Sequence, residues 1–303
     1  MFQMGKKFLP LETEICICGG TQQMSAPGTL PRVLNIAHRG ARSLAPENTL
    51  AAAHKALEVG ADMCELDIRM TADDEPIVLH DNTLERTSNV RDVFPGRKPW
   101  LVHKFSLDEI RLLDFGSWFR EQDPFGQIAK GAVTESDLAG YVGEPAPTLR
   151  EALVFTLEHD RRVNLEIKDL SGCPGHSQVV EKVVSMVEEL DMVDQVLVSS
   201  FHQDYLVQTR KIHDRIPTAL LVSKPSSQPG DLLRELGAQV YHPRKTAVRS
   251  KDISLLNRLG FPVHVWNVND PKTMRRLVKA GVSGIFTDFP QLLTSVLASY
   301  GEG

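Results

Sequence analysis

Residues 34–81 read LNIAHRGARSLAPENTLAAAHKALEVGADMCELDIRMTADDEPIVLHD, and this stretch decides the fold. It contains two apolar strand-like runs, 33–38 and 63–69, with a helix-like run at 48–59 between them. This order is the unit of a parallel sheet covered by helices. A further apolar run, Pro76 to His80, begins after only five residues. Because a parallel neighbour needs a crossover of about a dozen residues, we expect this run to fold back antiparallel.

The alternation of strand-like and helix-like runs continues to the C-terminus. The predicted strands are 33–38, 63–69, 163–168, 195–201, 218–223, 239–242, 262–267 and 284–288. The predicted helices are 48–59, with Asn48 as a possible N-cap, 148–159, 176–190, 203–213, 230–237, 250–260, 270–281 and 290–299. An open doubly wound sheet would more often carry an early glycine-rich phosphate fingerprint, which is absent here. The sequence therefore predicts an α/β fold, a closed (β/α)₈ TIM barrel.

Two regions fall outside this alternation. Residues 1–31 show no sustained periodicity and are predicted to be an N-terminal tail, in which Ile15 to Cys18 form a possible short edge strand. The barrel domain is assigned to 32–303. Within it, residues 82–147 interrupt the pattern directly after the predicted hairpin, and long loops in compact domains are usually functional or disordered. We interpret 82–147 as a small insertion that caps the barrel mouth and shapes substrate access.

Composition narrows the class of protein. Hydrophobic residues make up 42% and charged residues 24%, which is typical of a soluble globular protein. The net charge of −5 argues against a broad nucleic-acid surface. The four cysteines are too scattered for a disulfide framework and favour a reducing compartment. Glu12 and Glu14 interrupt the first apolar region, and no run approaches the roughly 20 residues of a membrane span. We expect a cytoplasmic protein without stable membrane insertion.

Carboxylates recur on two of the predicted strands. Glu65 and Asp67 are two residues apart and therefore face the same side, and Glu166 and Lys168 repeat this spacing on the next strand. Buried carboxylates repel one another unless a cation neutralises them. Three carboxylates without cysteine favour one hard divalent cation, Mg²⁺ or Ca²⁺. The alternative is an interior salt-bridge network among the same four side chains.

Histidines and cations stand at the ends of the same elements. His38 ends the first strand and His80 ends the hairpin, and such a pair can supply one base and one acid at neutral pH. A single strand-end histidine is more often structural, but two at one mouth favour chemistry. Arg39 and Lys168 bring a planar fork and a point charge that suit a phosphate ester.

Two aromatic residues also end strands. Phe201 follows Ser199-Ser200, and Trp266 lies within Val265-Trp266-Asn267. An aromatic at a strand end usually serves packing, but these two could also form an apolar wall for the uncharged part of a substrate. Both interpretations stay open at this point.

Several short motifs occur in order from Val33 to the C-terminus. They are His38-Arg39-Gly40, Pro46-Glu47-Asn48-Thr49, Glu65-Leu66-Asp67-Ile68, Pro76-Ile77-Val78-Leu79-His80-Asp81, Leu165-Glu166-Ile167-Lys168, Val265-Trp266-Asn267-Val268 and Gly284-Ile285-Phe286-Thr287-Asp288. On these residues the chain resembles the glycerophosphodiester phosphodiesterases, which are (β/α)₈ barrels. Asn267 departs from the pattern, because the family often has Thr there.

The resemblance implies a role for each site residue. His38 and His80 would be the catalytic acid/base pair, while Glu65, Asp67 and Glu166 would bind the divalent cation. Arg39 and Lys168 would contact the phosphate. The implied substrate is a small glycerophosphodiester, hydrolysed to glycerol 3-phosphate and an alcohol.

Two alternatives stand beside this function. One is a lyase-like relative, similar to phospholipase D-type toxins or phosphatidylinositol phospholipase C, that stops at a cyclic phosphate. Those relatives generally are secreted or act on membranes, and the chain shows no export signal. The other is a catalytically silent binding barrel, which predicts the loss of a histidine or of a metal carboxylate. The sequence leaves open the alcohol, the identity of the ion, the nucleophile, which histidine is the acid, and the oligomeric state.

Overall fold

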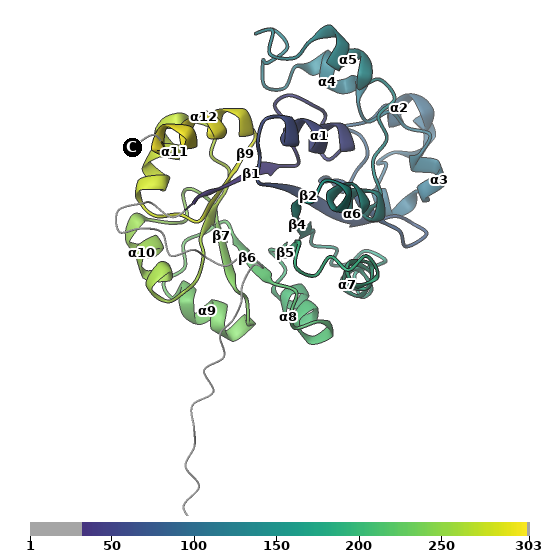
Figure 1. The fold of residues 1–303 in the computed structure, drawn as a ribbon. Coiled ribbons are helices and arrows are strands. Elements are labelled where there is room, and N and C mark those ends of the chain that lie inside the picture. Colours follow the sequence, from purple (N-terminus) through teal and green to yellow (C-terminus); the bar gives the residue numbers. More distant parts are fainter. Residues whose placement is uncertain (1–31, 302–303) are drawn as a thin grey trace, which may run out of the picture.

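The computed structural model describes residues 32–301, so the predicted tail 1–31 and its possible strand Ile15–Cys18 lie outside the described residues. Eight parallel strands within 32–301 form the barrel: β1 (Leu34–His38), β2 (Met63–Met70), β4 (Arg162–Ile167), β5 (Val196–Ser200), β6 (Thr218–Val222), β7 (Val240–Pro243), β8 (His264–Val265) and β9 (Gly284–Thr287). Their order is β7-β6-β5-β4-β2-β1-β9-β8. Parallel bridges Tyr241↔Val263 and Arg244↔Trp266 join β7 to β8 and close the ring. The predicted TIM barrel is confirmed (Figure 1).

Helices surround the barrel on the outside. They are α1 (Leu50–Glu58), α6 (Leu149–Glu158), α7 (Val179–Glu189), α8 (Gln203–Ile212), α9 (Pro229–Leu236), α10 (Ser250–Arg258), α11 (Pro271–Lys279) and α12 (Pro290–Gly301), and each coincides with a predicted helix. The predicted cap of the first helix was wrong by one residue. The Thr49 hydroxyl, and not Asn48, accepts the Ala52 N–H. Asn48 instead has a positive φ of 59°, and its side chain turns to Asp67.

The strand period of two decides which side chains enter the barrel. On β4, Val163, Leu165 and Ile167 belong to the apolar core beneath the helices, while Asn164 and Glu166 line the cavity inside the ring. Helix α7 meets this outer face with a stripe of valines, among them Val179, Val183 and Val187, all fully buried. Burying each such side chain contributes about 1.5 kcal/mol or more. Because the valine stripe packs against the outer face of β4, the alternate residues Asn164 and Glu166 are directed into the barrel.

The predicted hairpin is also confirmed. Strand β3 (Pro76–Val78) pairs antiparallel with β2, with Val78 opposite Ile68. The Leu79 N–H then donates to the Asp67 carbonyl at 2.8 Å, and Arg69 Nε donates to the His80 carbonyl at 2.7 Å. These bonds carry the chain back past Asp67, so His80 returns to the barrel mouth.

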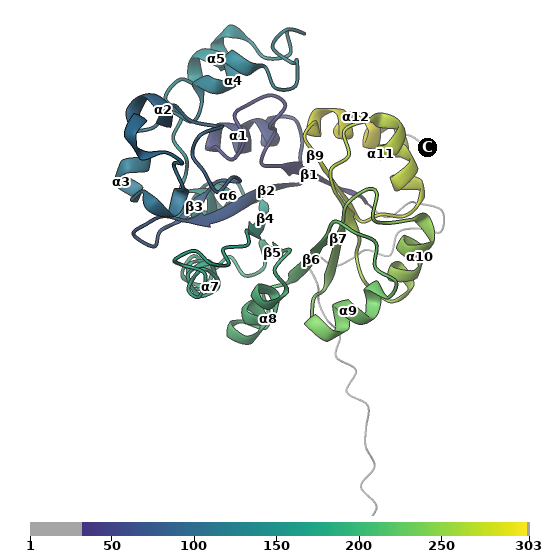
Figure 2. The ribbon, with the colours of Figure 1, turned by 180° about the vertical axis from the view of Figure 1, so that it is seen from behind.

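The segment 82–147 contains short helices: α2 (Val90–Val93), η1 (Pro95–Arg97), η2 (Val102–Lys104), α3 (Leu107–Ile110), α4 (Ser117–Gln122) and α5 (Glu135–Gly140). In both views these helices lie at the flank of the barrel, beside α1 and α6 (Figures 1 and 2). Two of its loops reach the rim, where Arg86 pairs with Glu47 and the Phe125 ring lies 5.5 Å from Phe289. None of the residues lining the cavity described below comes from 82–147. A role of this segment in capping the mouth and controlling access stays a prediction. Among residues 32–301, no helix combines the length and the apolar character needed to span a membrane.

Candidate active site

The strands deliver predicted site residues to one end of the barrel in matching register. His38 on β1 lies opposite Glu65 on β2, and Asp67 lies opposite Glu166 on β4. A cavity of about 480 Å³ opens there. It is lined by the predicted residues His38, Arg39, Glu65, His80, Glu166, Lys168, Phe201 and Trp266. Asp67 does not line the cavity, but its buried carboxylate joins the same cluster.

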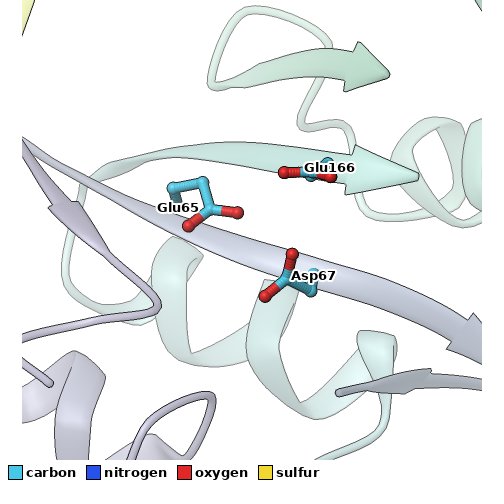
Figure 3. A group of neighbouring side chains, drawn as sticks. All are labelled: Glu65, Asp67 and Glu166. Atoms are coloured by element: carbon cyan, nitrogen blue, oxygen red, sulfur yellow. The ribbon is translucent and has the colours of Figure 1, made fainter. Parts of the chain in front are cut away.

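Three carboxylates on the neighbouring strands β2 and β4 lie close to one another, as Figure 3 shows. Oxygens of Glu65, Asp67 and Glu166 all lie within 4.8 Å of one another, and all three side chains are buried. Burial, together with the charges of Asp67 and Glu166, raises the pKa of Glu65 well above its usual value. Burial and the Asp67 charge likewise raise the pKa of Glu166. Asp67 differs, because burial opposes its ionisation but the charges of Arg39 and Lys168 lower its pKa. The ionised forms of Glu65 and Glu166 are therefore the ones that this cluster disfavours.

The bonding of these oxygens fits a divalent cation. Glu65 Oε1 and Asp67 Oδ1 are buried and accept no hydrogen bond from residues 32–301. The predicted salt-bridge alternative is partly present, since Lys168 Nζ lies 2.5 Å from Glu166 Oε1 and 3.3 Å from Asp67 Oδ1. It leaves Glu65 Oε1 without a partner, and a buried unpaired carboxylate oxygen is costly. A hard cation with oxygen ligands would satisfy it.

Arg39 owes its position to a tight turn after β1. Its φ is 58°, and its backbone N–H donates to Glu65 Oε2 at 2.9 Å. The guanidinium lies between Glu47, at 2.8 Å, and Asp67, at 3.2 Å. Gly40 follows at φ 77°, where an added Cβ would come within 2.6 Å of the Ala52 backbone. The glycine of the His-Arg-Gly motif thus allows this turn to pack closely against α1.

His38 is held by a distant aspartate. Its Nδ1 lies 2.6 Å from Asp288 Oδ1, and its Nε2 lies 3.9 Å from Glu65 Oε2. Asn267 Nδ2 also lies 2.6 Å from Nδ1. Burial and then the charge of Arg39 lower the pKa of His38 to about 4, while Asp288 acts in the opposite direction. His38 is therefore a neutral imidazole at neutral pH, with the aspartate favouring the proton on Nδ1 and leaving Nε2 as the acceptor.

His80 has an aspartate of its own. Asp81 Oδ1 lies 2.6 Å from His80 Nδ1, and Arg86 Nε donates to Asp81 Oδ2 at 2.6 Å. The His80 side chain is 31% exposed, compared with 13% for His38. The two histidines thus share one arrangement but differ in their access to solvent.

Several residues near the site were missed as site residues from the sequence. Asp81 and Asp288 lie in the matching motifs, but nothing local indicates that each would hold a histidine. Arg244 and Lys245 line the cavity although neither belongs to a matching motif. The sequence did contain a signal for Arg244. It lies two residues after His242, so both side chains are on the same face of the strand, the face directed into the barrel.

The two predicted aromatic residues, Phe201 and Trp266, contact each other and both line the cavity. The Phe201 and Trp266 rings lie 5.7 Å apart with an interplanar angle of 89°, an edge-to-face contact. Trp266 Nε1 donates to the His242 carbonyl at 2.8 Å, whereas Phe201 is 42% exposed. They therefore form both a packing contact and an apolar wall of the cavity.

Residues 38–292 match the model of the Glycerophosphoryl diester phosphodiesterase family. The chain belongs to this family. It is therefore an enzyme of the phosphodiesterase class, and the resemblance predicted from the motifs is confirmed. A glycerophosphodiester phosphodiesterase of Caldanaerobacter subterraneus is 31% identical over 270 residues, covering 89% of this chain and 100% of that protein. One from Bacillus subtilis is 30% identical over 279 residues, covering 89% and 88% of the two chains.

Solved structures of similar proteins have the same fold. An Oleispira antarctica phosphodiesterase, solved in complex with the product sn-glycerol-3-phosphate, has a TM-score of 0.71 at 28% identity and covers 89% of this chain and 97% of its own. A glycerophosphodiester phosphodiesterase from Agrobacterium tumefaciens has a TM-score of 0.67 at 26% identity, covering 88% and 100% of the two chains. These similarities support the barrel independently of its individual contacts.

Proposed function

We propose that the protein hydrolyses glycerophosphodiesters to glycerol 3-phosphate and an alcohol, using a divalent cation and two histidines. The observation that carries this proposal is the cluster of Glu65, Asp67 and Glu166, in which Glu65 Oε1 and Asp67 Oδ1 accept no hydrogen bond from residues 32–301. Two aspartate-backed histidines lie at the same cavity. The relatives named glycerophosphodiester phosphodiesterase, and the Oleispira complex with sn-glycerol-3-phosphate, support the same substrate class.

The three carboxylates would hold the cation, Mg²⁺ or Ca²⁺, which supplies positive charge against the phosphoryl oxygens. Arg39 and Lys168 line the same part of the cavity and would contact the phosphate. A phosphodiester anion repels nucleophiles, and further negative charge develops as the bond to phosphorus forms. Fixed cations in a cavity that is partly closed to water lower that barrier.

His38 suits the role of base. It is neutral at neutral pH, and Asp288 holds its Nδ1 so that Nε2 accepts the proton of the attacking hydroxyl, from water or from the glycerol of the substrate. His80 would protonate the departing alkoxide while the old phosphorus–oxygen bond breaks. Net hydrolysis consumes one water. After direct attack by water, proton exchange with solvent restores both histidines to their starting protonation states. After attack by the glycerol hydroxyl, water opens the cyclic phosphate, with His80 accepting its proton and His38 returning one to the glycerol oxygen.

Phe201 and Trp266 would contact the alcohol part of the substrate, because they line the cavity on the side of β5 and β8. The composition supports a cytoplasmic enzyme acting on a small molecule, with no nucleic-acid partner. Fractionation of cells expressing the tagged full-length chain tests the location, and recovery in a membrane or secreted fraction would contradict it.

The test is turnover of glycerophosphoglycerol followed by ³¹P NMR, with Mg²⁺, Ca²⁺ or Mn²⁺ and with EDTA. We expect glycerol 3-phosphate to accumulate and EDTA to abolish turnover reversibly. His38→Ala and His80→Ala should each reduce kcat by about 10²- to 10⁴-fold, while the control His54→Ala, on the outside of α1, should not.

Each alternative has its own outcome in this experiment. A cyclic phosphate that accumulates without being opened would favour the lyase-like reaction. Turnover that EDTA leaves unchanged would contradict the metal role, and turnover unaffected by His38→Ala would contradict the acid/base pair. No turnover of any glycerophosphodiester would favour a silent binding barrel.

A further inference from the structure

The cations on the two sides of the cavity differ in how they are paired. On the side of β1, β2 and β4, protein carboxylates already neutralise them. Lys168 pairs with Glu166 at 2.5 Å, and Arg39 pairs with Glu47 at 2.8 Å. The positive charges of Lys168 and Arg39 are therefore balanced by protein carboxylates before a substrate binds.

The β7 side is different. Arg244 and Lys245 line the cavity, both are exposed, and neither forms an ion pair with another residue in the range 32–301. Lys245 acts on Asp270 only at longer range. The pKa of Asp270 is lowered first by the Thr273 N–H that its carboxylate accepts and only to a smaller extent by the charge of Lys245. This side thus presents two positive charges that the protein leaves without a close counterion.

The backbone at these two residues is held in place. The Arg244 N–H donates to the Val222 carbonyl at 2.9 Å, and the Lys245 N–H donates to the Trp266 carbonyl at 2.7 Å. Two residues before Arg244, the buried His242 ring packs inside the barrel 4.9 Å from Phe286. Since side chains two apart on a strand share a face, Arg244 lies above His242 at the mouth. Backbone hydrogen bonds of the barrel thus hold Arg244 and Lys245 at the rim of the cavity.

The surroundings of these charges also select against one kind of ligand. Trp266, whose ring forms the wall with Phe201, is bridged to Arg244 in the β ladder. Aromatic walls can bind a quaternary ammonium group such as choline. Here that group would meet two uncompensated positive charges, and like charges disfavour one another. An anionic group would be attracted instead.

We propose that Arg244 and Lys245 bind a second phosphate carried by the leaving alcohol, so that the preferred substrates are glycerophosphodiesters with an anionic phosphate in their alcohol part. This inference rests on the proposed function and specifies its substrate class. The arginine fork and the lysine ammonium both suit phosphate oxygens. A cavity of about 480 Å³ is in the size range of ligand pockets, so it has room for a second phosphate beside the scissile one.

A matched pair of substrates tests the proposal. Glycerophosphoglycerol releases a neutral glycerol, whereas 1,3-bis(glycerophospho)glycerol releases the same alcohol bearing a second phosphodiester. After division by two for its equivalent bonds, we expect kcat/KM for the second substrate to exceed that for the first by about ten-fold at low salt. Glycerophosphocholine should be the poorest of the three. The preference should shrink as ionic strength rises, because exposed charges are screened.

Charge-removing variants assign the effect to the two residues. Arg244→Gln and Lys245→Gln should each reduce the preference by up to about five-fold, the upper range for an exposed ion pair, because kcat/KM should fall more for 1,3-bis(glycerophospho)glycerol than for glycerophosphoglycerol. The control is Lys251→Gln, which removes an exposed lysine on α10, outside the cavity, and should leave the preference unchanged.

A binding measurement separates this inference from the proposed function. In the slow His80→Ala background, and after the same division by two, calorimetric titration should show 1,3-bis(glycerophospho)glycerol binding about five-fold more tightly than glycerophosphoglycerol. Arg244→Gln should reduce this difference. Hydrolysis of all three substrates without preference, or with choline preferred, would overturn the inference and leave the proposed function intact. Equal binding of the two glycerol compounds would also overturn it. Preferred binding without any hydrolysis would instead overturn the proposed function alone.

Discussion

The contact between Asp288 and His38 offers the sharpest single test of the site. The two residues are 250 positions apart in sequence, yet Asp288 Oδ1 lies 2.6 Å from His38 Nδ1. Asp288→Asn keeps the shape of the side chain and removes its charge. The asparagine amide can donate to Nδ1, which would move the ring proton to Nε2 and block the nitrogen that we propose as the proton acceptor.

The magnitude follows from the bond that is lost. A hydrogen bond to a charged group contributes about 1.5–3 kcal/mol, which corresponds to about 10- to 100-fold in rate. Selection of the wrong tautomer adds to this, and the equivalent change in a serine-protease triad costs about 10⁴-fold. We therefore expect kcat to fall by at least about 100-fold. KM should change by less than about three-fold, because Asp288 is not among the residues that line the cavity.

Steady-state hydrolysis of glycerophosphoglycerol measures both constants, and circular dichroism establishes that the variant is folded. Asp231→Asn is the matched control, since Asp231 pairs with Arg234 on the exposed face of α9. A folded Asp288→Asn variant that loses less than about five-fold in kcat would refute the positioning role. So would a rise in KM with kcat unchanged.

Three further predictions concern the framework of the site. Glu47→Gln should destabilise the fold by about 3 kcal/mol in urea denaturation, because it removes the nearest carboxylate from the two buried arginines Arg39 and Arg42. Burial opposes ionisation of Glu47, but its arginine neighbours lower its pKa to about 2, so its stabilisation is present above pH about 4.5 and is lost as the pH falls toward 2; an equal acid-induced loss in Glu47→Gln would contradict this. Glu65→Gln should leave the metal-free melting temperature unchanged or higher, since it removes one carboxylate from a crowded buried cluster. It should abolish the increase in the free energy of unfolding that metal produces, about 2.7 kcal/mol for wild type at roughly 100 times Kd. If the variant keeps this increase, Glu65 is not a ligand. Gly40→Ala should cost about 2 kcal/mol or more because of its positive φ and the Ala52 contact, unlike Gly96→Ala, which meets nothing within 4 Å; equal stabilities would refute the close-approach argument.

Much of the architecture follows from local sequence patterns. The alternation of strand and helix runs predicted the barrel, and the five-residue spacing before Pro76 predicted the antiparallel return that places His80. The period of two predicted that Glu65 and Asp67 face the same side, and the structure has them in one carboxylate cluster with Glu166. These features depend on neighbours a few residues away, so a single sequence contains them.

Contacts across the closed ring depend on more than local pattern. Asp288 reaches His38 only because β9 pairs with β1, and Arg86 reaches Glu47 only through a loop of the segment 82–147. Local reasoning placed the Asn48 side chain at a helix cap. Its side chain instead donates a hydrogen bond to Asp67, because φ at Asn48 is positive and Thr49 provides the cap.

The sequence alone therefore determined which side chains point into the barrel, because that direction is set by the two-residue repeat of each strand. Only the tertiary structure decided which of them are paired and which remain free. Arg39 and Arg244 both line the cavity, but Arg39 is tied to Glu47 and Asp67 whereas Arg244 has no ion-pair partner within 32–301. That difference arises from strand register and ring closure, which bring carboxylates to one side of the mouth and leave the other side positive.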